Sequence, residues 1–211
     1  MTAQSSINAL NGDIGQLEIS QDKPLYLNND VQTISLSGLE DGELLMTLEQ
    51  QPTFSLPFEK NRFNKLAAKI VVSDDEAMDI AALTDHLKNE LKKKWKIPKL
   101  QFKDPVYKDS IDIKFPFSGT VELGDEKGHS IDVDSAHINK VIKKQNRSNP
   151  DLKKIILRLG VWYKNDADKG PSGGIYFTLK YIEVDMHGKS VMPKAKKQAA
   201  AAPQVVEVDS E

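Results

Sequence analysis

The chain has 211 residues, of which 39% are hydrophobic, and a formal net charge of −2 at neutral pH. This length fits one domain with a substantial core, or at most two small ones. The absence of cysteine excludes disulfides, thiolate metal sites and cysteine nucleophiles, and it fits a reducing compartment. No apolar run approaches the ~20 residues of a membrane span and no basic, apolar leader opens the chain, so we expect a soluble protein without membrane contact.

The small net charge hides an asymmetry along the chain. Residues 1–87 contain 5 Lys or Arg against 14 Asp or Glu, whereas residues 88–197 contain 24 against 14. Charge separated in this way indicates that the later part of the chain faces an anion. A lysine-rich solvated surface explains the same charge equally well.

Short β-strands are predicted through the first half of the chain. Apolar residues alternate with polar ones there, between breaks that contain Gly, Asp or Pro. Residues 1–25 are a candidate flexible start. The predicted strands are 31–37, 43–49, 52–58 and 66–72, and the alternation places Phe54, Leu56 and Phe58 on one face.

A helix is predicted over about 74–96. Ser73 and Glu76 form a capping box at its start, where acidic side chains complement the helix dipole. Apolar residues then recur at helical spacing, lysines crowd the last turn, and Pro98 ends the helix.

Strands resume at 110–117, with Ile111, Ile113, Phe115 and Phe117 on one face, and at 129–134. The polar, basic stretch 137–151 predicts a short helical turn followed by a loop. Residues 153–164 and 174–184 predict a long hairpin across the sequence DADKGPSGG. Residues 189–211 have no periodic apolar face, so we expect a disordered, weakly acidic C-terminal tail that contains Glu207, Asp209 and Glu211.

This pattern predicts a mainly β protein, with residues 1–188 in a single domain. An OB-fold-like Greek-key barrel with one inserted helix is the leading architecture. A β-sandwich is the alternative, because periodicity does not distinguish a closed sheet from stacked sheets.

The hairpin has one apolar face and one unusual face. If Trp162 lies opposite Tyr176, then Arg158 lies opposite Lys180 on the same side of the sheet. Aromatic rings stack on the exposed bases of single-stranded nucleic acid, and cations follow its phosphates. A covered barrel surface or a dimer interface would also explain the rings. The predicted nucleic-acid contacts on this face are Lys154, Arg158, Trp162, Lys164, Tyr176 and Lys180.

The order of these segments resembles the replicative single-stranded DNA-binding proteins of tailed phages and large DNA viruses. Residues 61–96 resemble their strand and inserted helix, and residues 152–184 resemble their closing hairpin. The resemblance implies an OB-fold with DNA contacts from Arg62, Arg158, Trp162, Tyr163, Lys164 and Tyr176. Strand alternation turns Tyr163 inward, so the two predictions disagree there.

Family tails are strongly acidic and often end in an aromatic residue that binds replication proteins. The tail here has only Glu207, Asp209 and Glu211 and no aromatic residue. Contact of this tail with a polymerase or helicase is an expectation that follows only from the resemblance.

Further residues are candidates around the hairpin. Lys143, Lys144 and Arg147 are candidate phosphate contacts, and Tyr107 is a candidate for additional stacking. The histidines have no ligand spacing and no nucleophile–base pair stands out, so we expect no catalysis and no cofactor. A metal-dependent nuclease that uses the Asp-rich segments is a weaker alternative.

The sequence therefore predicts a viral protein that binds single-stranded DNA without sequence preference and coats it during replication or recombination. The expected location is the cytoplasm of the infected host cell, and the expected state is a monomer or a homodimer. The alternative is a protein-interaction or virion structural module that uses the same aromatic and basic face.

Overall fold

The structure, a computed structural model of the chain, describes residues 14–23, 30–39, 42–49, 52–97, 99–145, 151–185, 187 and 191, with the side chains of Lys144, Gln145 and Asp151 excepted. These residues form a mainly β fold with two α-helices, which confirms the predicted fold class at this level. Neither of these helices is long and apolar enough to cross a membrane.

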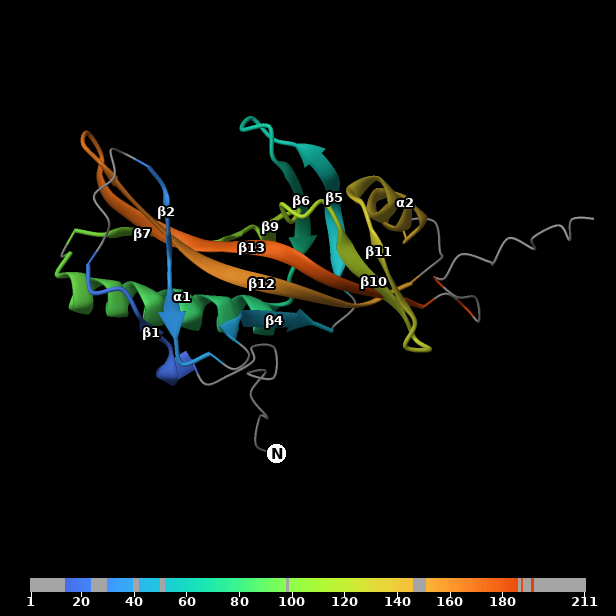
Figure 1. Cartoon of the computed structure of the whole chain (residues 1–211), viewed down its shortest axis with the longest axis horizontal. Coiled ribbons are helices and arrows are strands. Elements are labelled where there is room, and N and C mark those ends of the chain that lie inside the picture. Colours follow the sequence, from blue (N-terminus) through green and yellow to red (C-terminus); the bar gives the residue numbers. More distant parts are fainter. Residues whose placement is uncertain are drawn as a thin grey trace, which may run out of the picture.

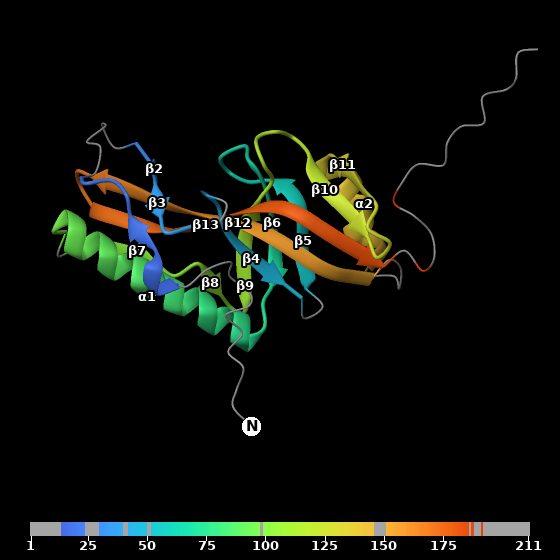
Figure 2. The ribbon, with the colours of Figure 1, turned by 60° about the horizontal axis from the view of Figure 1, so that its bottom comes forward.

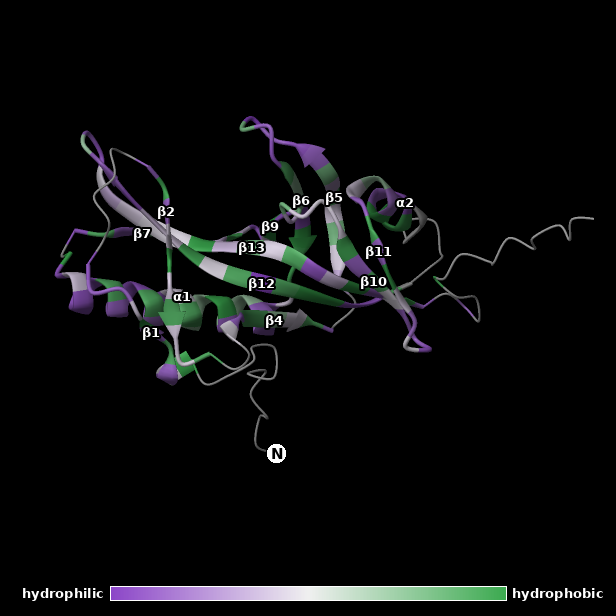
Figure 3. Ribbon diagram, viewed as in Figure 1, coloured by the Kyte–Doolittle hydropathy of each residue, from purple (hydrophilic) through white to green (hydrophobic). Residues whose placement is uncertain are grey.

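The longest strands of the described residues are two antiparallel strands of 16 residues, β12 (Asp151–Asp166) and β13 (Gly170–Asp185). They form the predicted C-terminal hairpin and run through the length of the molecule (Figure 1). Hydrophobic and hydrophilic residues alternate along both strands (Figure 3). One side of the hairpin, the core face, is buried; the other, the outer face, carries Lys154, Ile156, Arg158, Gly160, Trp162 and Lys164 of β12 and Gly174, Tyr176, Thr178 and Tyr181 of β13.

Strands from earlier in the chain pair along both edges of this hairpin. β2 and β4 pair antiparallel with β12, whereas β7, β9 and β10 pair parallel with successive parts of β13. β6 and β5 extend the sheet beyond β9, and β11 extends it beyond β10. The bounds are β2 (Gln32–Ile34), β4 (Leu44–Leu48), β5 (Thr53–Lys60), β6 (Leu66–Val71), β7 (Gln101–Lys103), β9 (Ser110–Lys114), β10 (Val121–Asp125) and β11 (Ser130–Val133).

Two smaller pairings complete the strands of the described residues. β8 (Val106–Tyr107) pairs with β9, and β1 (Glu18–Ile19) pairs with β3 (Leu36–Ser37) after the short helix η2 (Ile14–Gln16). Each predicted strand is present at least in part, whereas β1, β7, β8 and β10 were not predicted. Strand pairing within the described residues does not close the sheet into a barrel. The pairings establish a mainly β fold without establishing the Greek-key barrel.

Helix α1 (Asp74–Trp95) follows β6, in agreement with the predicted helix. The Ser73 hydroxyl accepts the Glu76 N–H at 3.3 Å, and the Glu76 carboxylate accepts the Ser73 N–H at 2.8 Å, which is the predicted capping box. α1 lies alongside the half of the hairpin that contains its turn (Figures 1 and 2). The helical face buried in the core consists of Ile80, Leu83, Leu87, Leu91 and Trp95.

The C-terminal half of α1 holds residues 17–21 against the core. The indole N–H of Trp95 donates to the carbonyl oxygen of Gln21 at 2.8 Å, and the Lys94 ammonium donates to that of Ile19. A ring nitrogen of His86 lies 2.7 Å from the carbonyl oxygen of Leu17. The described part of the predicted flexible start is therefore anchored to α1, while residues 1–13, 24 and 25 lie outside the described residues.

Two apolar side chains that the alternation placed in the core are exposed. Phe117 is 97% exposed, because β9 ends at Lys114 and Pro116 begins a turn that the Gly119 N–H closes onto the Pro116 carbonyl at 3.1 Å. Leu56 is exposed because the pairing of β5 with β6 shifts register on both sides of it. Strict alternation fails wherever a proline or a bulge interrupts the ladder.

Helix α2 (Ser135–Gln145) is longer than the predicted helical turn. The Asp134 carboxylate accepts the His137 N–H at 2.8 Å and so caps its first turn. The Asn139 side chain donates to the Phe58 carbonyl and accepts the Phe58 N–H, both at 2.9 Å. This amide takes the place of a strand partner on β5 and fixes α2 at the end of the molecule opposite the hairpin turn (Figure 1).

Trp95 is the side chain of α1 whose loss we expect to cost most. Trp95→Ala removes a ring that is 92% buried and packs edge-on against Tyr163, so the free energy of unfolding should fall by about 3–5 kcal/mol. Met78→Ala, on the same helix but 70% exposed, should change it by less than about 0.5 kcal/mol. Urea denaturation followed by circular dichroism measures both, and equal effects would contradict this packing.

Candidate nucleic-acid interface

The outer face carries the predicted aromatic side chains, but in a different strand register. Trp162 lies opposite Gly174, and Tyr176 lies opposite Gly160. The prediction that Trp162 faces Tyr176 is wrong by two residues, because the ladder continues to Asp166 and Gly170 and leaves a turn of only three residues. A shift of two keeps each side chain on its face, so both rings still lie on the outer face.

Each of these two rings rests on the glycine of the opposite strand. A Cβ atom on Gly174 would lie 2.8 Å from Nε1 of Trp162, and a Cβ atom on Gly160 would overlap the ring of Tyr176. Glycine at both positions lets the rings lie against the backbone. Both aromatic residues remain partly exposed, so each ring still has surface available to a ligand.

A lysine from a neighbouring strand lies near each ring. Nζ of Lys103, on β7, is 5.6 Å from the centre of the Trp162 ring, and Nζ of Lys114, on β9, is 4.7 Å from that of Tyr176. These are cation–π distances. Neither ammonium group forms an ion pair with a described residue. We call Lys103, Trp162, Tyr176 and Lys114 the aromatic row.

Burial lowers the pKa of the Lys114 ammonium, and the positive charge of Lys65 lowers it further. Both causes disfavour the charged form, and an anion next to this lysine would favour it. The electrostatics of the row therefore suit an anionic ligand.

Neither lysine of the row was among the predicted contacts. Lys114 follows Ile111 and Ile113 in strict alternation, which was a signal that it points to the outer face. Lys103 gave no such signal, because β7 has three residues and takes its place beside Gly174 only through parallel pairing with β13.

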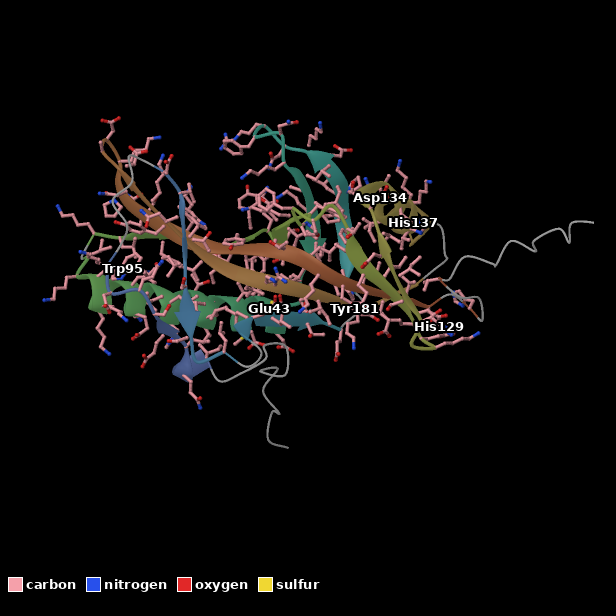
Figure 4. All side chains as sticks on the ribbon, viewed as in Figure 1. Glu43, Trp95, His129, Asp134, His137 and Tyr181 are labelled. Atoms are coloured by element: carbon pink, nitrogen blue, oxygen red, sulfur yellow. The ribbon has the colours of Figure 1, made fainter. Side chains whose placement is uncertain are left out.

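Glu43 neutralises two of the predicted contacts. One of its carboxylate oxygens lies 2.5 Å from Arg158 and the other 2.5 Å from Lys180. Figure 4 shows Glu43 near the middle of the hairpin. A hollow of about 350 Å³ adjoins these cations and is lined by Thr178, Ser118 and Thr120 among others.

The other two cations predicted on β12 also have acidic partners. Lys154 lies 3.8 Å from Glu49 and 3.9 Å from Glu183, and Lys164 lies 3.1 Å from Asp166. Exposed ion pairs of this kind are weak, so phosphate can replace the carboxylates. The predicted cations of β12 thus lie on the predicted face, but each is already paired.

Tyr163 is not part of this surface. Its side chain is 2% exposed, and its ring packs edge-on against Trp95 with the ring centres 5.2 Å apart. The contact implied for Tyr163 by the family resemblance is incompatible with this placement, and the inward orientation predicted by strand alternation is correct.

The remaining predicted contacts are not members of the row. Arg62 is in the turn between β5 and β6, where its guanidinium carbon is 4.7 Å from the centre of the Phe63 ring. Tyr107 is 66% exposed on β8, and Lys143 is exposed on α2 at the end opposite the hairpin turn. The Lys144 side chain, Arg147, Glu207, Asp209 and Glu211 lie outside the described residues, as does most of the predicted tail.

The outer face becomes acidic toward the α2 end. Tyr181 covers Gly124 there, and its hydroxyl lies 3.3 Å from the Glu183 carboxylate. Burial, followed by the negative charge of Glu183, raises the pKa of Tyr181 to about 12. Tyr181 lies closer to that end than Glu43 does (Figure 4). An anionic ligand is therefore favoured at the half of the face near the hairpin turn.

The Asp-rich segment around 125–134 has structural partners. The Asp125 carboxylate accepts the N–H groups of Lys127 and His129 at 3.0 Å, and Asp134 caps α2. No group of three or more His, Asp or Glu that could hold a metal ion occurs among the described residues.

Comparison with known proteins finds no matching family model, no matching curated protein and no matching solved structure.

The pairing of Glu43 predicts a pH effect. The hydrogen bond from Lys180, followed by the charge of Arg158, holds the pKa of Glu43 below the ordinary value of about 4.3. The stability that the Glu43 carboxylate contributes is thus fully present at a pH above its ordinary pKa. It is lost as the pH falls through the lowered pKa of the folded protein.

NMR titration of the Glu43 carboxyl carbon should show the lowered pKa, and Lys180→Gln should raise it. Lys88→Gln, which changes a lysine paired with Asp85 on α1, should leave the titration unchanged. If Lys180→Gln leaves the pKa of Glu43 unchanged, the ion pair between Glu43 and Lys180 is contradicted.

Proposed function

We propose that this protein binds single-stranded DNA without sequence preference and coats it during viral DNA replication or recombination. The observation that carries the proposal is the aromatic row, in which two partly exposed rings each lie beside a lysine without an acidic partner among the described residues. The proposal includes an OB-fold-like domain acting as a monomer or a homodimer in the cytoplasm of the infected host cell. It also includes contact of the tail with replication proteins.

The ligand is single-stranded because the row offers two kinds of contact at once. A single strand exposes the faces of its bases as well as its phosphates, and stacking on an aromatic ring contributes about 1–3 kcal/mol per base. The bases of a duplex are stacked inside it, so a duplex would place phosphates on the lysines but no base on the aromatic rings. Stacking accepts every base, which accounts for the proposed lack of sequence preference.

Binding requires the lysines to exchange one partner for another. A cation–π contact at an exposed site contributes about 0.5–1 kcal/mol, which is less than a base stack. A base that takes the place of the ammonium on Tyr176 also brings a phosphate to which Lys114 can move. The free protein thus holds both lysines close to the positions where phosphates would arrive.

Trp162→Ala and Tyr176→Ala should each weaken binding of poly-dT about 5- to 150-fold, the loss of one base stack. Binding should also weaken steeply with salt. Fluorescence anisotropy of labelled poly-dT measures each affinity. The chain has two tryptophans, so in a Trp95→Phe background the quenching of Trp162 fluorescence also reports the titration of Tyr176→Ala.

Met78→Ala is the control, because Met78 is 70% exposed on α1 and was not among the predicted contacts. The control should keep wild-type affinity. A wild-type protein that does not respond to micromolar poly-dT would overturn the proposal in favour of a module that binds protein through the same face.

Glu43→Gln should tighten binding. The substitution releases Arg158 and Lys180 beside the hollow, where two further phosphates can bind. The slope of log K against log salt concentration should therefore steepen by roughly 1.4, at about 0.7 per phosphate contact. Glu90→Gln removes the same charge from α1, where Glu90 pairs with Lys93, and should leave binding unchanged. Equal effects of the two variants would contradict a local role for Glu43.

A further inference from the structure

The turn between β5 and β6 presents a cation and an aromatic ring in a fixed conformation. The Asn61 side-chain oxygen accepts the N–H groups of Phe63 and Lys65 at 2.9 and 3.1 Å. The turn is closed by a hydrogen bond from the Asn64 N–H to the Asn61 carbonyl at 2.8 Å. Phe63, at the tip of this turn, is 66% exposed with the Arg62 guanidinium beside it.

A second exposed phenyl ring lies next to this turn. Phe117 is 97% exposed on the turn that Pro116 begins, and Nζ of Lys65 is 5.7 Å from its ring centre. The Phe115 N–H donates to the Leu66 carbonyl at 3.0 Å, which ties the two turns together. We call Arg62, Phe63, Lys65 and Phe117 the turn platform.

The turn platform has the same chemistry as the aromatic row. Neither Arg62 nor Lys65 forms an ion pair with a residue that the structure describes. A single exposed phenylalanine needs no explanation. Two of them on hydrogen-bonded turns, each beside a cation with no acidic partner, are matched to a ligand that has both flat apolar surfaces and negative charge.

The platform is also continuous with the row. Lys114 lies near the Tyr176 ring, and it is close enough to Lys65 for the two positive charges to act on each other. A polyanion that leaves Tyr176 would reduce this repulsion by following the lysines across β9 toward Phe117. The acidic surface around Tyr181 and Glu183 disfavours a path in the other direction.

We propose that the turn platform is a second stacking subsite for the same single strand of DNA, which crosses the sheet from Trp162 over Tyr176 to Phe117. This inference rests on the proposed function. A short oligonucleotide occupies the aromatic row alone, whereas a longer one also covers the platform.

The test compares oligo-dT of about 4 and about 16 nucleotides, which span the site sizes of one OB-type fold. Phe117→Ala, alone and with Phe63→Ala, should weaken binding of the longer oligomer about 5- to 150-fold and leave the shorter one unchanged. Trp162→Ala should weaken both. Lys65→Gln should reduce the slope of log K against log salt concentration by about 0.7 for the longer oligomer and leave it unchanged for the shorter one.

Met78→Ala, which removes an apolar side chain about as exposed as Phe63 but on α1, should alter neither affinity. Because Phe63 and Phe117 are surface residues, the variants should unfold at the wild-type temperature, which a thermal melt verifies. If the wild type binds both oligomers and Phe117→Ala changes neither affinity, or both equally, the platform subsite is overturned while the proposed function stands. If the wild type binds neither oligomer, the proposed function itself fails.

Discussion

Backbone hydrogen bonding along the β12–β13 hairpin determines where the rest of the described chain lies. Each of its strands uses one edge for the other and the second edge for strands from earlier in the sequence. β2 and β4 take one side, and β7, β9 and β10 follow one another along the other. Lys103 and Lys114 therefore reach Trp162 and Tyr176 because strand pairing puts them there, and the cation–π contacts follow from that placement.

Total charge describes this surface poorly. Residues 88–197 are strongly basic, yet the lysines and the arginine on the outer face of β12 have carboxylate partners, two of which, Glu43 and Glu49, come from the acidic first part of the chain. The two halves of the sequence thus interleave on one face. Lys103 and Lys114, which lie near aromatic rings on this face, have no such partner among the described residues, so an anionic ligand is favoured beside these rings and not across the whole basic region.

Features that depend on neighbours in the sequence were predictable. Helix α1 followed from its capping box and its 3.6-residue periodicity, and the two faces of β12 followed from alternation, which also placed Tyr163 correctly. On β13 alternation holds only as far as Leu179, where the register shifts. The register of the hairpin was not predictable, because it depends on where the turn closes. Phe117 was misplaced because β9 ends at Lys114 and Pro116 begins a turn directly before Phe117.

Features that depend on distant pairing left no local signal. β7 and β10 pair in parallel with a strand about 60–70 residues later in the chain, so neither Lys103 nor the acidic surroundings of Tyr181 could be assigned to a face in advance. Glu43 reaches Arg158 and Lys180 only because β4 pairs with β12. The aromatic residues of the candidate site were thus predictable as members of one face, and the residues that tune them were not.

Because each ring lies against a glycine, the substitutions that are tolerated at these four positions depend on one another. A side chain gained at position 160 would displace the ring at 176, and a side chain gained at 174 would displace the ring at 162. Each aromatic residue is thus compatible with its neighbour only while that neighbour remains a glycine, and loss of a ring would leave that glycine without its constraint. Among relatives of this chain, positions 160 and 176 should therefore change as a pair, as should 162 and 174, and the two pairs can drift independently of one another.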